Sequence, residues 1–279
     1  MRQRPLLFGI HASPPEKLKW VYYVAPFIII ILGYHVFSTI YLADNPHGKM
    51  LPSYWMMAHR MWDLAFTLNI RTHTYLLWSD TAMSLMRFGS GLLAASVVGF
   101  LLGINIGLFP SLRYLVLPVV VVLSFVPMLA VLPILLIVFG IGEEMKILLI
   151  FLGVTFFITR DIYASTREIP QELLVTSRTL GANQFAYVYF VALPMLMPRL
   201  LQTIRLNLGP SWLFLIASES IASSTGLGHQ IFILQRYQDM SGIIPYVMWI
   251  TFLAFIIFYM MVLVERCAFP WKDDEGAGS

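Results

Sequence analysis

Long apolar runs restrict the possible fold of this chain more than any other sequence feature. Hydrophobic residues make up 58% of the chain and charged residues 12%, whereas soluble domains carry about 25% charged residues. Runs of about 20 apolar residues can cross a bilayer as helices, which satisfy their own backbone polar groups there. We therefore predict an all-α polytopic membrane protein with about six transmembrane helices, at 21–42, 83–108, 115–140, 146–158, 205–221 and 245–264.

The segments between these runs divide the chain into five parts. We expect a tail at 1–20, a first transmembrane helix at 21–42, an outer or interfacial segment at 43–80, a membrane core at 81–266 with a polar loop at 164–200, and a tail at 267–279. The run at 21–42 is too long for a cleaved signal peptide, and no small-x-small site follows it cleanly. We expect it to be retained as a helix.

Residues 54–78 mix methionine and tryptophan with charged residues such as Arg60 and Asp63. This pattern is typical of an amphipathic helix in the membrane interface.

His59 and His73 have no third ligand that would make a metal site. The single cysteine, Cys267, excludes an intramolecular disulfide and a cysteine metal cluster. A net charge of +3 without a basic, aromatic-lined cluster excludes nucleic acid as a partner.

Small residues recur at every fourth position of the run at 83–108, and they predict close helix packing. Four residues advance 400°, so the small side chains stay near one face and let two backbones approach in lipid. Packing within one subunit is favoured over a dimer interface. The residues are Gly91, Ala95, Gly99, Gly103 and Gly107. In the next run, Pro118, Pro127 and Pro133 each predict a kink, which proteins tolerate beside a neighbouring helix or a water-lined pathway.

Glu219 is the ionisable residue that stands out within the apolar runs. A charge at mid-membrane costs about 3 kcal/mol, so it should face a partner or a water-filled pathway. We group Glu219 with Ser218, Asn207 and Arg87 as candidate pathway residues, with Arg87 as the candidate ion-pair partner. A role in maintaining the fold and a role as a pathway gate both remain open.

The stretch 167–200 is a polar and amphipathic island between apolar runs. Pro170 suits the first turn of a helix to about residue 180, and Gly181 supplies the positive φ of a helix end. Asn183 can cap a second short helix at 184–192. We expect Leu193-Pro194 and Met197-Pro198 to end that helix and turn the chain back towards the membrane. Two short helices folded about a glycine are typical of a docking element.

Lys and Arg are distributed unevenly between the predicted loops. Twelve of the 18 Lys and Arg residues fall on the side that holds the N-terminus, which predicts that both ends and the island are cytoplasmic. This side carries Arg2, Arg4, Lys17, Lys19, Arg113, Arg160, Arg167, Arg178, Arg199, Arg205, Arg266 and Lys272; the other carries Lys49, Arg60, Arg71, Arg87, Lys146 and Arg236. Between Glu168 and Met197 only Arg178 is basic. This favours a protein partner over a lipid surface for the island.

The island resembles the "EAA" loop of the binding-protein-dependent inner-membrane components, the permeases of ABC importers. Gly181 and Leu193-Pro194 match that loop at its spacing, while Val175-Thr176-Ser177 stand where Glu-Ala-Ala usually stand. The similarity extends from about residue 79 to 271. It is strongest to the nitrate, sulfonate, taurine and bicarbonate branch, through FVPMLAVLPILLIVFGIGEEMKILL and SESIASSTGLGH.

This resemblance implies a type I importer permease in a bacterial inner membrane, with 43–80 periplasmic and 81–266 as the permease core. It implies a homodimer, cytoplasmic ATP-binding subunits, a periplasmic solute-binding protein and a small oxyanion or sulfonate as cargo. ATP and Mg²⁺ would bind the partner ATPase, with no cofactor in this chain. The implied ATPase-coupling loop, 164–200, includes Val175, Thr176, Ser177, Arg178, Gly181, Ala182, Phe185, Leu193 and Pro194.

The sequence contains no GxxxxGK[ST], GxSxG, HExxH or CxxC motif. We therefore do not expect this chain to be an enzyme, and a membrane-embedded enzyme is the least favoured alternative. An ion-gradient-driven secondary transporter is the second alternative. Such transporters commonly contain inverted repeats and ion ligands at the membrane midplane, and neither pattern is evident here.

Overall fold

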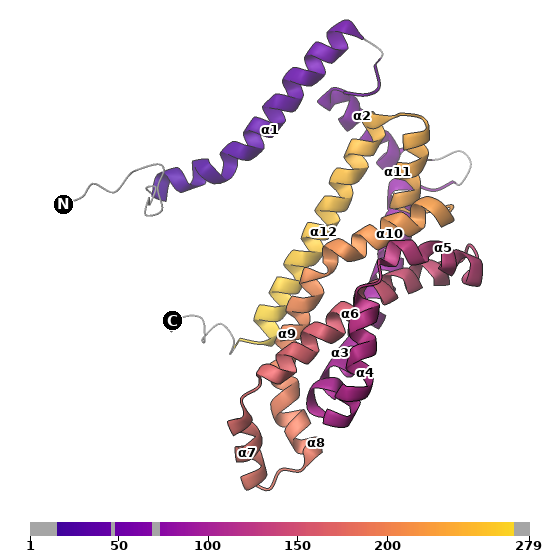
Figure 1. The fold of residues 1–279 in the computed structure, drawn as a ribbon. Helices are drawn as coiled ribbons and strands as arrows, with labels where there is room; N and C mark the ends of the chain where they lie inside the picture. The colour runs from indigo at the N-terminus through magenta and orange to yellow at the C-terminus, as the bar shows by residue number, and fades with distance from the viewer. Residues whose placement is uncertain (1–15, 46–47, 69–72, 271–279) are drawn as a thin grey trace, which may run out of the picture. The chain divides into compact units, whose positions relative to one another are not determined.

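The computed structural model describes residues 16–45, 48–68 and 73–270 (Figure 1). Apart from one isolated β-bridge between Leu68 and Tyr75, the regular structure in these residues is helical, which confirms the all-α prediction. Within these residues, five helical segments are long and apolar enough to cross a membrane, and one bent helix pair would make a sixth. The predicted tails at 1–20 and 267–279 lie largely outside the described residues.

The described residues form two compact units. Among the described residues, the first comprises 16–45, 48–63 and 234–245, and the second 64–68, 73–233 and 246–270. In the first unit, α1 (Glu16–Asp44) is joined to the chain that follows it: Tyr34 Oη donates to the Pro52 carbonyl at 2.7 Å, and Tyr54 Oη donates to the Ile31 carbonyl at 2.6 Å. The ring of His35 stacks on Tyr54. His35 therefore packs against a neighbouring aromatic residue.

The predicted amphipathic helix is α2 (Tyr54–Phe66). Its Met57 is buried, while Trp55 and Trp62 are exposed. This distribution agrees with an amphipathic helix, and the position of α2 in the membrane interface stays a prediction.

The second unit is built around α3 (Leu76–Leu108) and α6 (Glu143–Glu168). Gly91, Gly99, Gly103 and Gly107 of α3 lie against Ile150, Ile158, Ile162 and Thr166 of α6, a constant offset of 59 residues. A constant offset means that the two helices run parallel and in register. The small face of α3 therefore packs against another helix of the same chain.

Serine and threonine side chains in these apolar helices bond to their own backbone. Ser96 donates to the Leu92 carbonyl at 2.7 Å, and Thr159 donates to the Thr155 carbonyl at 2.8 Å. Such i−4 bonds satisfy a hydroxyl where no water is at hand. These helices can therefore carry hydroxyl groups without leaving polar atoms unpaired.

The proline-rich run forms two helices, α4 (Pro110–Ser124) and α5 (Met128–Phe139), which meet at an angle of 97°. The break lies at Phe125–Pro127, whereas Pro118 and Pro133 are accommodated inside the helices. Of the three predicted kinks, the one at Pro127 thus becomes a sharp break.

The predicted helix at 146–158 is too short. The observed α6 begins at Glu143 and ends at Glu168. It continues through the polar residues after Ile158 because nothing interrupts the helix until Ile169, which is extended before Pro170.

The prediction that Leu193-Pro194 and Met197-Pro198 end the second island helix is wrong. After α7 (Gln171–Thr179) and α8 (Gln184–Tyr187), a π-helical turn (Val188–Ala192) leads directly into α9 (Leu193–Leu206). Pro194 falls in the first turn of α9, directly after the π-helical turn. Pro198 lies inside α9, and helices that span membranes tolerate such prolines.

The predicted helix at 205–221 is divided in the structure. Asn207 separates α9 from α10 (Leu208–Ala222). A further helix, α11 (Leu227–Arg236), occupies part of the predicted connection at 222–244, and α12 (Met240–Ala268) follows it.

The glycine face of α3 generates a prediction about stability. A Cβ at residue 103 would lie 2.7 Å from Ile162 Cβ and 2.8 Å from the Thr159 carbonyl oxygen, so the two helices would have to separate. We expect Gly103→Ala to lower the free energy of unfolding in mixed micelles by about 1–3 kcal/mol.

Gly89→Ala is the matched control, because a Cβ at residue 89 would have no atom within 4 Å. Helix propensity should leave this variant unchanged or more stable by up to about 1 kcal/mol. Equal effects of the two variants would contradict the packing account.

Candidate functional site

Arg87 of α3 is the centre of a buried ionic cluster. Its side chain is fully buried and uses all five N–H donors. Nε and Nη2 donate to the two carboxylate oxygens of Glu143 at 2.5 and 2.8 Å. Nη1 donates to Glu219 Oε1 at 2.7 Å and to the Thr225 carbonyl at 2.8 Å, and Nη2 also donates to Thr225 Oγ1 at 3.0 Å. One guanidinium thus joins α3, α6, α10 and the loop after α10.

Glu219 of α10 is also fully buried, and both of its oxygens are bonded. Besides Arg87, Ser84 Oγ lies 2.7 and 2.9 Å from the two carboxylate oxygens, and the Gly228 N–H donates to Oε2 at 2.9 Å. The carboxylate therefore has an opposite charge and hydrogen-bond donors around it, which offset the cost of burying it.

Backbone N–H groups at the start of α11 complete the cluster. The Gly226 N–H donates to Asp80 Oδ1 at 2.7 Å, and the Leu227 N–H donates to Ser84 Oγ at 2.9 Å. Gly226 has φ +115°, and a Cβ there would lie 2.5 Å from the Glu219 carboxyl carbon. Only glycine fits this turn without displacing the ion pair.

Among the predicted pathway residues, the structure brings Arg87 and Glu219 together but not the other two. Ser218 Oγ donates to the Leu215 carbonyl and Asn207 Nδ2 donates to the Thr203 carbonyl, both on their own chain segment. Glu143 is a member of this cluster that the sequence does not single out, and its Oε1 also accepts from Lys146 Nζ at 2.7 Å.

Two signals in the sequence point to this larger cluster. An acidic pair begins α6, and glycines at 226 and 228 follow the Glu219 helix. Arg87 and Lys146 balance the charges of Glu143 and Glu219. The arrangement is suited to holding helices together, because the central guanidinium has no donor left for a ligand.

The end of α7 and the cap of α8 form as the island's sequence predicts. Gly181 has φ +82°, and the Ala182 N–H donates to the Ser177 carbonyl at 2.9 Å, which closes the end of α7. Asn183 Oδ1 accepts from the Ala186 N–H at 2.8 Å and caps α8. Figure 1 places α7 and α8 beyond the end of α6 that is opposite to α5.

The 171–192 segment exposes large apolar side chains. Val175 is 61% exposed, Leu180 82% and Phe185 85%, and none of the residues of α7 and α8 is buried. Thr176, Ser177 and Arg178 lie on the same short helix, α7. Leu193 and Pro194 begin α9 and connect this segment to the membrane core.

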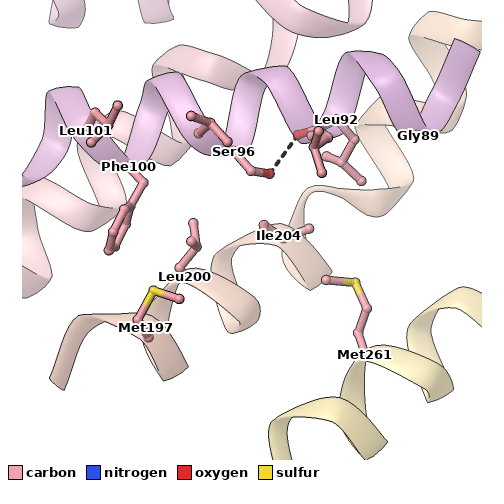
Figure 2. Close-up of a pocket in the computed structure, with 11 residues that line it drawn as sticks. Gly89, Leu92, Ser96, Phe100, Leu101, Met197, Leu200, Ile204 and Met261 are labelled. Carbon is pink, nitrogen blue, oxygen red and sulfur yellow. Dashed lines mark hydrogen bonds between the residues drawn. The ribbon is translucent and has the colours of Figure 1, made fainter. Parts of the chain in front are cut away.

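An apolar groove of about 510 Å³ lies between α3, α9 and α12 (Figure 2). Its polar side chain is Ser96, which donates to the Leu92 carbonyl of its own helix. The other lining residues are Gly89, Leu92, Leu93, Val97, Phe100, Leu101, Met197, Leu200, Ile204 and Met261. Such a lining cannot recognise an anion. In the described residues no group of three or more His, Cys, Asp or Glu is placed to hold a metal ion.

The sequence is similar to those of several membrane transport proteins. The family described as "Binding-protein-dependent transport system inner membrane component" matches residues 91–267. The taurine transport system permease protein TauC of Escherichia coli is 33% identical over 198 residues, which cover 71% of this chain and 72% of TauC. The nitrate import permease protein NrtB of Synechocystis is 28% identical over 187 residues, 67% of this chain and 68% of NrtB. These relatives are transport permeases, not enzymes.

A solved structure has the same fold. A chain of the MetNI methionine ABC transporter in inward-facing conformations aligns with a TM-score of 0.52 and 21% identity, covering 78% of this chain and 98% of that chain. The similarity agrees with the helical architecture described above.

The Arg87–Glu219 pair generates a prediction about coupling. We expect Arg87→Met alone and Glu219→Gln alone each to lower the free energy of unfolding by about 3–5 kcal/mol, because each leaves a buried partner uncompensated. The double variant should lose less than the sum of the two, with a coupling of at least about 1 kcal/mol in unfolding measured in mixed micelles.

The control is the Arg60–Asp239 pair, at 3.4 Å with partly exposed side chains. Its coupling should stay below about 1 kcal/mol. Additive effects at Arg87 and Glu219 would show that the two residues do not stabilise the fold as a pair.

Proposed function

Because the chain belongs to the family of binding-protein-dependent transport system inner membrane components, we propose that it is the permease subunit of an ABC importer for a small sulfonate or related oxyanion. The permeases named for taurine and for nitrate support this substrate class. Both of those solutes carry a compact group of oxygens with delocalised charge. A periplasmic binding protein delivers the solute, and a separate ATPase drives its passage.

The exposed apolar surface of the 171–192 segment is the observation that supports coupling to an ATPase. Val175, Leu180 and Phe185 are mostly exposed, and a soluble partner with an apolar groove would cover them. Val175 replaces the glutamate usual at this position of the loop, so contact with the ATPase rests on apolar shape there. ATP and Mg²⁺ bind to that partner and not to this chain.

The membrane arrangement follows from the same assignment. The chain spans the bacterial inner membrane with both termini and the 164–200 loop in the cytoplasm, and 43–80 on the periplasmic side. Two copies form a homodimer around the pathway. The Arg87–Glu219 pair acts as a fixed clamp in this arrangement, because a side chain with five donors in use is costly to separate from its partners.

Reconstitution tests the proposed function directly. The complex of this chain, its ATPase and its binding protein should take up radiolabelled taurine, methanesulfonate or nitrate into proteoliposomes only when ATP is present on the cytoplasmic side. Uptake that needs an ion gradient and not ATP would favour a secondary transporter and contradict the proposal.

The exposed apolar surface generates a prediction about assembly. We expect Phe185→Asp to reduce copurification of the ATPase with the permease by about tenfold or more, because the charge would have to be desolvated in the interface. Pull-down of the tagged permease with quantified ATPase measures this loss.

Ile141→Asp is the control, since Ile141 is 80% exposed but lies just before the opposite end of α6. It should leave copurification unchanged. Equal recovery of the ATPase with Phe185→Asp and with the unmodified chain would show that this segment does not bind it.

A further inference from the structure

Arg160 is a cation in a membrane helix without a carboxylate partner in the described part of the chain. It lies in α6, a helix apolar enough to span the membrane. Arg87 and Arg205 also lie in candidate spans, and each contacts a carboxylate, at Glu219 and Glu265 respectively. Asp161 follows Arg160 directly, and successive residues of a helix do not face each other. Arg199, in the candidate span at 184–206, also has no carboxylate partner among the described residues. What distinguishes Arg160 is therefore its contacts with Ser124 and Phe125.

The contacts of Arg160 place its guanidinium at the break between α4 and α5. Nη1 donates to Ser124 Oγ at 2.9 Å, and the guanidinium carbon lies 5.6 Å from the centre of the Phe125 ring. Ser124 ends α4, and the chain turns by 97° immediately after it. Ser124 Oγ donates its own hydrogen to the Val121 carbonyl at 2.7 Å. The hydroxyl is thus fixed as an acceptor for Arg160.

Most donors of Arg160 are still available. Of its five N–H groups, one has a hydrogen-bond partner in the described residues. Arg160 is exposed on this chain, and Phe125 beside it is 74% exposed. A guanidinium facing lipid at the centre of the bilayer would cost about 3 kcal/mol, and the cost is smaller towards the membrane surface; Arg160 lies eight residues before the end of α6. A water-filled pathway avoids that cost, and broken helices in transporters commonly line such pathways.

We propose that Arg160, held in place by Ser124 at the α4–α5 break, binds the oxyanion or sulfonate group of the solute as it passes through the membrane. The planar fork of an arginine matches two oxygens of such a group. One cation without further charges binds weakly enough to release its ligand. This proposal rests on the proposed function and adds a residue of the pathway to it.

Uptake by the reconstituted complex tests the proposal. We expect Arg160→Gln to raise the KM or reduce the rate for taurine, methanesulfonate or nitrate uptake by about tenfold or more, and Arg160→Lys to lie between it and the unmodified chain. ATP hydrolysis without binding protein should stay unchanged, because the 171–192 segment is untouched. Arg266→Gln is the control, as it removes the same charge from the exposed end of α12.

Thiol accessibility gives a second, independent test. In a Cys267→Ser background, Arg160→Cys should react with a charged, membrane-impermeant methanethiosulfonate reagent in the assembled complex, and saturating solute should slow the reaction. Phe255→Cys is the control, because Phe255 lies on the exposed apolar side of α12 and should not react.

The outcomes separate the two proposals. If the unmodified complex shows ATP-driven uptake but Arg160→Gln has the same KM and rate, the anion-binding role of Arg160 is wrong and the proposed function stands. An unreactive Arg160→Cys in an active complex would also overturn that role, in favour of a contact with lipid or with another subunit. If the unmodified complex takes up none of the three anions, the proposed substrate class is wrong.

Discussion

The second unit depends on one buried guanidinium. Moving an ion from water into a low-dielectric interior costs several kcal/mol, and only complete pairing offsets that cost. Arg87 meets this condition with five hydrogen bonds to α6, α10 and the loop after α10. If one partner moved, a buried charge would be left unpaired. The start of α6 and the end of α10 are therefore fixed against α3 at this point.

The parallel packing of α3 and α6 extends this fixed point along the unit. At Gly91, Gly99, Gly103 and Gly107 there is no room for an added methyl group, so the two helices cannot slide without separating. α6 has 26 residues and is about 39 Å long. Its far end continues through Ile169 and Pro170 into the exposed 171–192 segment. A force on that segment is therefore transmitted along a packed helix, since close-packed elements move as bodies.

The sequence predicts features that depend on a few neighbouring residues. Gly181, Asn183 and Pro170 act within one helical turn, and the structure has the positive φ, the side-chain cap and the helix start that they predict. The prediction that Pro194 and Pro198 end a helix is wrong because the effect of a proline depends on the turn that precedes it. In the structure a π-helical turn precedes Pro194, and the helix continues.

Partners distant in the sequence are harder to predict. Glu143 lies 56 residues from Arg87, and Glu219 lies 132 residues away. The cost of burying a charge indicates that Arg87 and Glu219 need partners. This cost is the basis of the prediction that the two residues pair, which the structure confirms. It does not reveal Glu143, because that contact depends on the register of α3 and α6, or Thr225, because that contact depends on the path of the loop after α10.

The two arginines at opposite ends of the α3–α6 pair illustrate how one residue type can serve opposite purposes in a membrane. Arg87 has no donor left, so an anion could bind it only by displacing Glu143 or Glu219, which are already at hydrogen-bond distance. Among the described residues, Arg160 has one bond, to a neutral hydroxyl, and it lies beside the break between α4 and α5. An incoming oxyanion would gain charge-assisted bonds there without breaking an ion pair. Complete pairing makes a cation structural, and incomplete pairing leaves it free to bind a ligand.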